Sequence, residues 1–268
     1  MLITLSNCGI RDKFTFYPDQ ESKIPEQNIP NYVTERSIRT RDNQNLQAFL
    51  FRHNDNINRS LIIYFHGNAG NIYHRFDDAT KLFDMNRNVL LVSYRGYSKS
   101  TGKPNEKGIY IDGESTVNYA IDSLGYDEKD ITIFGRSLGT TVAIHISQNR
   151  NFNSLILVTP LTSGKEMATA MGLGFIRFIA GKSYNSIEKI KNIKSRILII
   201  HGDKDEVIPY YMGKKLFDTF NGVKYIITIR EGGHNDLQDV DSQLFWGGIE
   251  KFLNSGCKKT PISSLRSS

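Results

Sequence analysis

A serine, an aspartate and a histidine occur in the chain where they could act together on a carbonyl group. Ser137 is the centre of a G-x-S-x-G pentapeptide, and Asp205 and His234 follow it in later loops. A serine hydroxyl is a weak nucleophile near neutral pH, so it needs a base to remove its proton and a carboxylate to orient that base. The three residues therefore predict hydrolysis through an acyl-enzyme.

The surroundings of the pentapeptide strengthen this prediction for Ser137. The pentapeptide lies between a predicted strand, Ile131–Phe134, and a predicted helix that begins near Leu138. A serine there occupies a sharp strand-to-helix turn with a strained backbone, where a Cβ on either flanking glycine would collide with the neighbouring strand or helix. A bare G-x-S-x-G arises by chance in roughly one chain in ten of this length. The position of the pentapeptide between a strand and a helix is therefore the stronger evidence that Ser137 is a nucleophile. The alternative interpretation is an ordinary tight turn.

Two aspartates follow the predicted strand Arg196–His201, and either could orient the base. Asp203 and Asp205 lie in the same loop, and no carboxylate follows the preceding predicted strand at Thr159–Ser163. His234 lies in a loop next to two glycines, not on an apolar face, which favours a base over a core histidine. Serine, aspartate and histidine thus occur in the order of positions 137, 205 and 234.

Eight runs of apolar and β-branched residues have the length of β-strands. From the third onward they are almost continuously hydrophobic, which is typical of strands buried on both faces, whereas the first two are patchier and are expected at an edge. The predicted strands are Tyr32–Thr40, Leu46–Arg52, Ser60–His66, Asn88–Tyr94, Asp130–Gly135, Ser154–Thr159, Arg196–His201 and Lys224–Arg230.

Segments with helical spacing alternate with these strands. Alternation predicts an α/β fold in which helices cover both faces of a mostly parallel sheet. The serine, the acid loop and the histidine then all follow C-terminal ends of parallel strands, the edge where such sheets hold their sites. The predicted helices are Tyr73–Asn86, Lys107–Leu124, Leu138–Gln148, Tyr210–Phe220 and Asp239–Asn254.

Backbone amides near Ser137 are expected to hold the oxyanion that forms during attack. One donor is the N–H of Leu138, the residue after the nucleophile, and the other comes from the loop His66–Asn71. The glycines of that loop allow a tight turn that can aim the Asn68 N–H at the space above Ser137. We therefore predict Asn68 and Leu138 as the oxyanion hole.

Five motifs together resemble α/β-hydrolases of the serine-aminopeptidase-like branch, close to the bud-emergence and "α/β-hydrolase domain-containing" proteins. The resemblance spans most of residues 55–254 and implies an eight-stranded hydrolase sheet, no metal or organic cofactor, Ser137 as nucleophile, Asp205 as acid and His234 as base. The acid stands four residues before Pro209, as in that family, which favours Asp205 and leaves Asp203 to structure the loop. The motifs are His66–Asn71, Tyr94–Ser100, Gly135–Gly139, His201–Pro209 and Gly233–Asp236.

An irregular interval, Leu161–Ser195, interrupts the alternation and predicts a small helical insertion near the site. Its Met167, Met171 and Phe175 have helical spacing, which is typical of core residues, and their position also makes them candidates for an acyl-binding wall. A small insertion implies an open site.

Two arginines and two histidines near the predicted site are expected to be structural. Arg95 and Arg136 are expected to pair with nearby acids, although each could meet a substrate carboxylate. His66 and His201 each begin a His-Gly pair at a strand end and are expected to fix loops through backbone hydrogen bonds.

The motifs divide the chain into an N-terminal extension (1–31), a hydrolase domain (32–257, with a cap-like insertion at 162–195) and a flexible tail (258–268). The 34 Lys and Arg residues are scattered among 28 Asp and Glu residues, so we expect a solvated surface and no nucleic-acid partner. No phosphate-binding glycine motif and no metal-binding pattern occurs.

We expect a cytoplasmic protein, because two distant cysteines fit a reducing compartment, with peripheral membrane contact as the alternative. The predicted function is a serine hydrolase that cleaves an ester or thioester in a small molecule, an acylated protein or a lipid. A peptidase-like hydrolase and a non-catalytic binding protein on the same fold are the alternatives.

Overall fold

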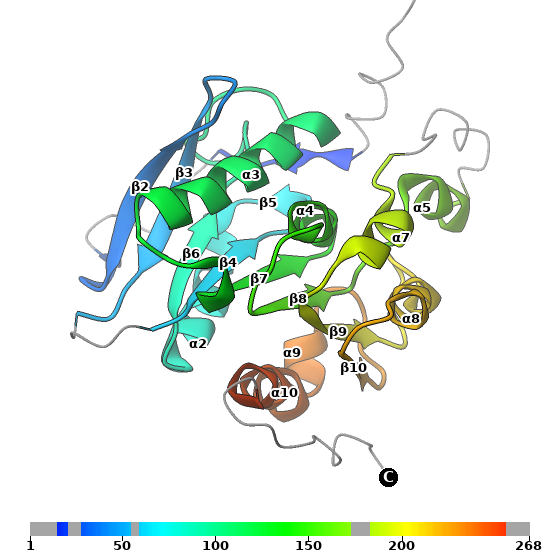
Figure 1. The fold of residues 1–268 in the computed structure, drawn as a ribbon. Helices are drawn as coiled ribbons and strands as arrows, with labels where there is room; N and C mark the ends of the chain where they lie inside the picture. Colours follow the sequence, from blue (N-terminus) through cyan, green and yellow to red (C-terminus); the bar gives the residue numbers. More distant parts are fainter. Residues whose placement is uncertain (1–14, 21–27, 55–58, 173–182, 256–268) are drawn as a thin grey trace, which may run out of the picture.

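A computed structural model describes residues 15–20, 28–54, 59–172 and 183–255 (Figure 1). Within these residues, eight strands form one sheet in the order β10-β9-β8-β7-β4-β6-β3-β2. Every predicted strand is found, with ends that differ by a residue or two. The strands are β2 (Val33–Arg39), β3 (Asn45–Phe51), β4 (Leu61–Phe65), β6 (Asn88–Val92), β7 (Ile131–Arg136), β8 (Ser154–Val158), β9 (Arg196–Gly202) and β10 (Lys224–Ile229).

The sheet is parallel from β10 to β6 and antiparallel at one edge, where β3 joins β6 and β2 joins β3. The two patchier strands therefore lie at the edge, as predicted. The central strands β4, β6 and β8 are buried along their whole length, which explains why they read as continuous hydrophobic runs. The predicted mostly parallel α/β sheet is confirmed.

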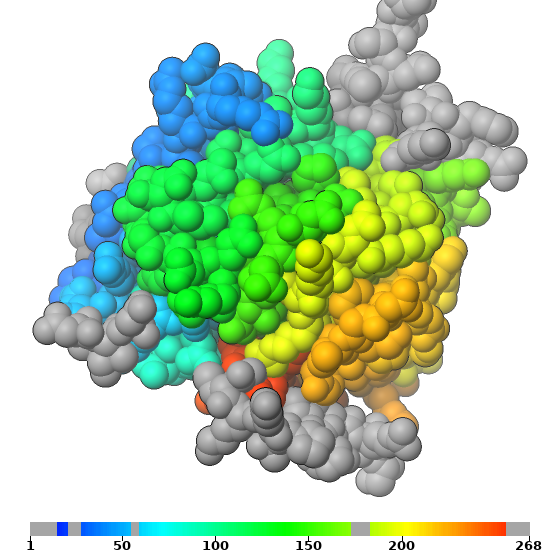
Figure 2. Space-filling view, viewed as in Figure 1, coloured from blue at the N-terminus to red at the C-terminus, as the bar shows by residue number. Residues whose placement is uncertain are grey.

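Helices cover both faces of the sheet (Figure 1). On one face lie α3 (Glu106–Asp122), α4 (Leu138–Ser147) and α8 (Tyr210–Thr219), and on the other lie α2 (Phe76–Asp84) and α10 (Ser242–Ser255), with the short α9 (Leu237–Val240) before α10. Viewed from the first side, α3 and α4 in green and α8 in orange close over the strands (Figure 2).

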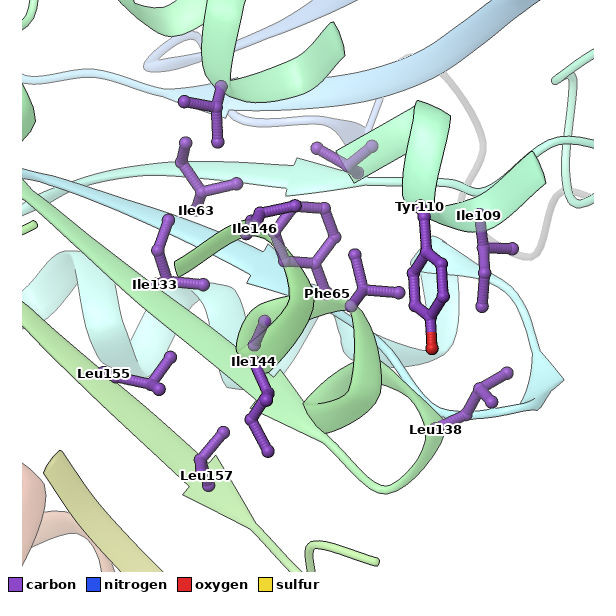
Figure 3. Packing of buried hydrophobic residues seen from close by; sticks show 14 of the residues in the cluster. Ile63, Phe65, Ile109, Tyr110, Ile133, Leu138, Ile144, Ile146, Leu155 and Leu157 are labelled. Carbon is purple, nitrogen blue, oxygen red and sulfur yellow. The ribbon is translucent and has the colours of Figure 1, made fainter. Parts of the chain in front are cut away.

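Each central strand supplies side chains alternately to two hydrophobic cores. Ile63 and Phe65 of β4 belong to the core under α3 and α4, whereas Ile62 and Tyr64 belong to the core under α2 and α10. Figure 3 shows the first core. There the side chains of β4, β7 and β8 face Leu138, Ile144 and Ile146 of α4 and Ile109 and Tyr110 of α3.

The N-terminal segment contributes an element that sequence reasoning did not anticipate. Tyr17–Pro18 forms a short strand, β1, that pairs in parallel with β5, Ala69–Gly70, outside the main sheet. Phe16, just before β1, is buried in the core under α3 and α4. The described part of this segment packs against the loop after β4.

The interval Leu161–Ser195 contains short helices, as expected: α5 (Gly164–Ala170), α7 (Ser186–Lys189) and the 3₁₀ turn Ile190–Asn192. Residues 173–182, the first residues of the extension and the tail 258–268 lie outside the described residues, so the division of the chain given above stays a prediction. No helix in the described part is long and apolar enough to cross a bilayer.

Candidate active site

Ser137 occupies the junction between β7 and α4 with φ 53° and ψ −119°, a strained conformation for a residue with a side chain. The flanking glycines make the turn possible. A Cβ on Gly135 would lie 2.6 Å from the Gly139 carbonyl oxygen, and a Cβ on Gly139 would lie 2.1 Å from the Phe65 carbonyl oxygen. The predicted sharp turn and both predicted collisions are confirmed.

The structure brings Ser137, His234 and Asp205 into one hydrogen-bonded chain. His234 Nε2 lies 3.0 Å from Ser137 Oγ, and His234 Nδ1 lies 2.8 Å from Asp205 Oδ2. All three residues are less than 10% exposed. Because a carboxylate only accepts hydrogen bonds, Nδ1 carries the proton and Nε2 presents its lone pair to the serine hydroxyl.

The Asp205 carboxylate is held on both oxygens. Oδ1 accepts hydrogen bonds from the N–H groups of Val207 and Ile208, at 2.9 and 2.7 Å. Oδ2 faces both His234 and the Nε2 atom of His201, which lies 3.2 Å away. Burial opposes ionisation, but the hydrogen bonds from His201 and His234 outweigh it and hold the pKa of this carboxyl well below its usual range. Asp205 is therefore ionised at neutral pH.

Asp203 lies apart from this chain of contacts. It is exposed, and its Oδ1 accepts a hydrogen bond from the Glu231 N–H at 2.7 Å. It ties the loop after β9 to the loop after β10, which is the loop-structuring role expected of it.

His201 does more than the loop fixing that the sequence suggested. Its Nε2 lies 2.8 Å from the Ile208 carbonyl oxygen, the expected backbone contact. The same atom faces Asp205, and since both neighbours are acceptors, Nε2 carries the proton. His201 precedes Asp205 by four residues, a spacing that could have suggested this contact.

Two further side chains hold the His234 loop, and sequence reasoning missed both contacts. Glu206 Oε2 accepts a hydrogen bond from the His234 N–H at 3.3 Å. The guanidinium of Arg136 donates to the Asn235 carbonyl oxygen at 3.2 Å and pairs with Asp78 at 3.5 Å. Arg136 thus has the acidic partner expected of it, and it also joins the serine turn to the histidine loop.

The loop after β4 passes beside Ser137. A Cβ on Gly67 would lie 3.5 Å from the Ser137 Cβ. His66 Nδ1 lies 2.7 Å from the Gly67 carbonyl oxygen, so this histidine fixes the loop as expected, and burial lowers its pKa to about 3 and keeps it neutral. Leu138 is the first residue of α4, where an N–H has no partner within the helix. Asn68 follows Gly67 directly.

Arg95 lies in the loop after β6 and is 5% exposed. Its Nε donates to Asp112 at 2.9 Å, and its Nη1 donates to Asp42 at 2.8 Å. The expected acidic partners are therefore present on two sides, and the guanidinium is fully engaged within the protein.

The candidates for an acyl-binding wall are only partly placed. Met167, in α5, packs against the core under α3 and α4. Met171, just after α5, is 57% exposed, and Phe175 lies outside the described residues. No group of three or more His, Cys, Asp or Glu side chains in the described residues is arranged to hold a metal ion.

Comparisons with known proteins agree with this architecture. The model of the prolyl oligopeptidase family matches residues 76–237. The protein bem46 of Schizosaccharomyces pombe is 32% identical over 98% of this chain and 93% of its own length. The α/β-hydrolase domain-containing protein aho-3 of Caenorhabditis elegans is 29% identical over 80% of this chain and 63% of its own length. The solved structure of the esterase Pf2001 of Pyrococcus furiosus superposes with a TM-score of 0.74 at 17% identity, covering 90% of this chain and 97% of the esterase.

Proposed function

The chain belongs to the prolyl oligopeptidase family and has the α/β-hydrolase fold, and on that premise we propose that it is a serine hydrolase of carboxylic esters or thioesters. One observation carries the proposal. Ser137, His234 and Asp205 form an uninterrupted hydrogen-bonded chain, with contacts of 3.0 and 2.8 Å, at the C-terminal edge of the sheet. This is the arrangement that activates a serine hydroxyl.

Acylation begins when Ser137 Oγ attacks the carbonyl carbon of the substrate. His234 Nε2, 3.0 Å away, takes the hydroxyl proton, and the Asp205 carboxylate stabilises the imidazolium that forms. The tetrahedral intermediate then collapses: its C–O or C–S bond breaks, the leaving group takes the proton from Nε2, and the acyl group stays on Ser137.

Deacylation repeats the same steps with water. His234 removes a proton from a water molecule as the water attacks the acyl carbonyl, and it returns the proton to Ser137 Oγ as the ester bond to the serine breaks. The products are a carboxylic acid and the free enzyme. Asp205 stays ionised throughout, because the hydrogen bonds from His201 and His234 hold its pKa low despite its burial.

The oxyanion of each tetrahedral intermediate would accept hydrogen bonds from the backbone N–H groups of Leu138 and Asn68. Two features support this assignment: Leu138 begins α4, where its N–H is free of the helix, and the loop containing Asn68 passes beside Ser137 at Gly67. Removing one oxyanion donor typically costs about 10²–10³ in kcat, so this hole supplies a large share of the rate.

The proposed substrates include small esters, acylated proteins and lipids. The esterase activity named for Pf2001 supports an ester, and the short insertion supports a site that admits a bulky acyl carrier. Met171, exposed just after α5, stays a proposed member of an apolar acyl wall. We propose cytoplasmic residence, with peripheral membrane contact as the alternative.

Peptide hydrolysis is the second candidate, and the match to the prolyl oligopeptidase family favours it. The same serine, histidine and aspartate would serve, because amide and ester hydrolysis pass through the same acyl-enzyme. Only the leaving group differs, so kinetic comparison on ester and anilide substrates separates the two activities.

A fluorophosphonate probe tests the proposal, because it phosphonylates an activated serine. We expect the wild-type chain to be labelled once, to lose esterase activity as it is labelled, and to lose both properties in Ser137→Ala. A panel of p-nitrophenyl esters and acyl thioesters of graded chain length, run beside aminoacyl p-nitroanilides, identifies the preferred class. Labelling that persists in Ser137→Ala would overturn the assignment. A folded wild-type chain that is inert to the probe and to the panel would favour the non-catalytic alternative.

A further inference from the structure

The loop that carries Asn68 is fixed through its carbonyl oxygens. Three successive carbonyls accept hydrogen bonds from side chains: His66 O from Tyr94 Oη at 2.9 Å, Gly67 O from His66 Nδ1 at 2.7 Å, and Asn68 O from Tyr97 Oη at 2.6 Å. A peptide unit is planar, so fixing a carbonyl also fixes the N–H on its other side. The two peptides that flank the Asn68 Cα are therefore both held.

The Asn68 carbonyl has a second donor from a distant part of the sequence. The N–H of Tyr17, in β1, lies 3.0 Å from Asn68 O, and the N–H of Asp19 lies 3.2 Å from Gly70 O. Phe16 anchors this segment, because its side chain is only 6% exposed in the core under α3 and α4. The chain near its N-terminus thus lies along the loop that carries the proposed oxyanion donor.

Tyr97 is well suited to hold one carbonyl permanently. Its ring is fully buried and lies with its centroid 5.2 Å from that of His66. Burial raises its pKa, so the hydroxyl keeps its proton and remains a donor wherever a hydrolase is assayed. Arg95, two residues earlier, anchors the same loop through Asp112 and Asp42.

The N-terminal segment and the Tyr97 loop are also bonded to each other. The N–H of Ser98 donates to the Asp19 carbonyl oxygen at 3.0 Å. Tyr97 and the segment Phe16–Asp19 therefore form one assembly around the Asn68 peptide, built from two parts of the chain about eighty residues apart.

We infer that Tyr97 and the segment Phe16–Asp19 are positioning residues for the oxyanion hole. By fixing Asn68 O they hold the peptide that follows the Asn68 Cα, while His66 holds, through Gly67 O, the preceding peptide that contains the Asn68 N–H, so that this N–H points at the oxyanion. The inference rests on the proposed function. Both donors bond to a backbone carbonyl oxygen, so we expect their loss to weaken binding of the transition state and to leave KM nearly unchanged. A purely structural role would lower stability and leave the turnover of each folded molecule unchanged.

Tyr97→Phe tests the first donor, because it removes one hydroxyl and keeps the buried ring. The matched control is Tyr126→Phe, which removes the hydroxyl of a partly buried tyrosine, the one that accepts from Asn88 Nδ2 at 2.8 Å, away from the site. Fluorophosphonate titration first counts the folded, reactive molecules in each sample. We expect kcat per titrated site on p-nitrophenyl acetate to fall about tenfold in Tyr97→Phe with KM within twofold, and to stay at the wild-type value in Tyr126→Phe.

The inhibition constant of an alkyl trifluoromethyl ketone is a second measurement, and a change in folding stability alone does not alter it. Such ketones add to the serine as a tetrahedral oxyanion, so their affinity reports the oxyanion hole. We expect the inhibition constant to rise in Tyr97→Phe by the same factor as kcat/KM falls, while the pH profile keeps its wild-type midpoint because His234 and Asp205 are untouched.

Tyr17→Pro tests the second donor, because proline lacks the N–H that reaches Asn68. Tyr17→Ala keeps that N–H and loses only the side chain, so it must lose less activity than Tyr17→Pro. The double variant Tyr17→Pro with Tyr97→Phe removes both donors from one carbonyl, and we expect it to lose about 10²–10³ in kcat, as when an oxyanion donor is deleted.

Wild-type turnover per titrated site in Tyr97→Phe, or a fall in kcat without a matching rise in the ketone inhibition constant, would overturn the inference and leave the serine mechanism standing. A wild-type chain that neither reacts with the probe nor hydrolyses the ester would contradict the proposed function, and the inference would fall with it.

Discussion

His201 Nε2 lies 3.2 Å from the Asp205 oxygen that also receives the hydrogen bond from His234. The acid is therefore held between two imidazoles, of which one reaches the serine and the other reaches the Ile208 carbonyl. The carboxylate is thereby charged and fixed, which are the two properties that an acid needs to orient a base.

The two aspartates of the loop after β9 are expected to differ sharply in their effect on activity. Asp205→Asn presents an amide in place of the carboxylate that accepts the hydrogen bond from His234 Nδ1–H, so kcat should fall by about 10⁴ with folding intact. Asp203→Asn keeps a side-chain oxygen for the Glu231 N–H and should lose little. Steady-state kinetics with circular dichroism as the folding check measures both variants. An equal loss in Asp203→Asn would reverse the assignment of the acid.

His201 is expected to act through Asp205. His201→Leu removes the Nε2–H donor and should lower kcat about tenfold, the scale of one lost hydrogen bond to a charged group. His201→Gln can place an amide N–H near the Nε2 position and should recover part of the loss. The two variants are compared by kcat per fluorophosphonate-titrated site. Equal activity in the two would show that the donor itself is unimportant.

Gly213, in α8, is expected to resist replacement by alanine. Alanine normally stabilises a helix interior relative to glycine by about 0.5–1 kcal/mol, but a Cβ here would lie 2.3 Å from His201 Nδ1. We expect Gly213→Ala to lower the free energy of unfolding by about 1–3 kcal/mol, the usual cost of overpacking.

The matched control is Gly247→Ala in α10, where a Cβ would meet nothing within 4 Å. It should raise the free energy of unfolding by about 0.5–1 kcal/mol. Urea titrations followed by fluorescence measure both variants, and a stabilised Gly213→Ala would contradict the close packing of α8 on His201.

Stability in acid should depend on Asp42. The hydrogen bond from Arg95 lowers the pKa of this carboxyl to about 2, whereas an unfolded aspartate titrates near about 3.9. Since the pKa of Asp42 is lower in the folded state than in the unfolded state, ionised Asp42 adds to the free energy of unfolding. This addition is fully present above pH about 4 and is lost as the pH falls towards about 2. Asp42→Asn should therefore be less stable than the wild type at pH 7, with a difference that shrinks on acidification.

Urea unfolding at stepped pH values measures this effect. Asp127→Asn is the control, because Asp127 is exposed and its partner Lys129 is exposed too, so its loss should change little at any pH. A difference for Asp42→Asn that stays constant from pH 7 to pH 2 would exclude the proposed linkage.

Much of this architecture is legible in the sequence because burial leaves a pattern. The strand Leu61–Phe65 is hydrophobic on both faces, and both faces are covered by helices. The meeting of Ser137, Asp205 and His234 could also be predicted. Each follows the end of a predicted strand, and parallel strands bring their C-terminal ends to one edge of the sheet. The pairing of Tyr17–Pro18 with Ala69–Gly70 was not, since two-residue strands have no periodicity to detect.

Contacts that depend on side-chain direction were also missed. The sequence singled out His201 as a loop residue, but only the structure shows the same nitrogen facing both Ile208 O and Asp205. Tyr97 lies in one of the family motifs, but the sequence suggested no role for it. The acceptor of its hydroxyl, Asn68 O, lies 29 positions away along the chain. Such pairings arise from tertiary packing, which local patterns do not encode.

The location of β10 at one end of the sheet has a consequence for how the protein acquires activity during refolding. The proposed base, His234, follows that last strand, whereas the proposed nucleophile, Ser137, follows β7 near the middle of the sheet. In a folding intermediate whose central strands are formed but whose β10 is not yet paired, Ser137 would have its native turn, but His234 would not be in place beside it. Recovery of esterase turnover after dilution from urea should therefore lag behind recovery of the central strands of the sheet. The rate at which activity returns would then report the rate at which β10 pairs with β9.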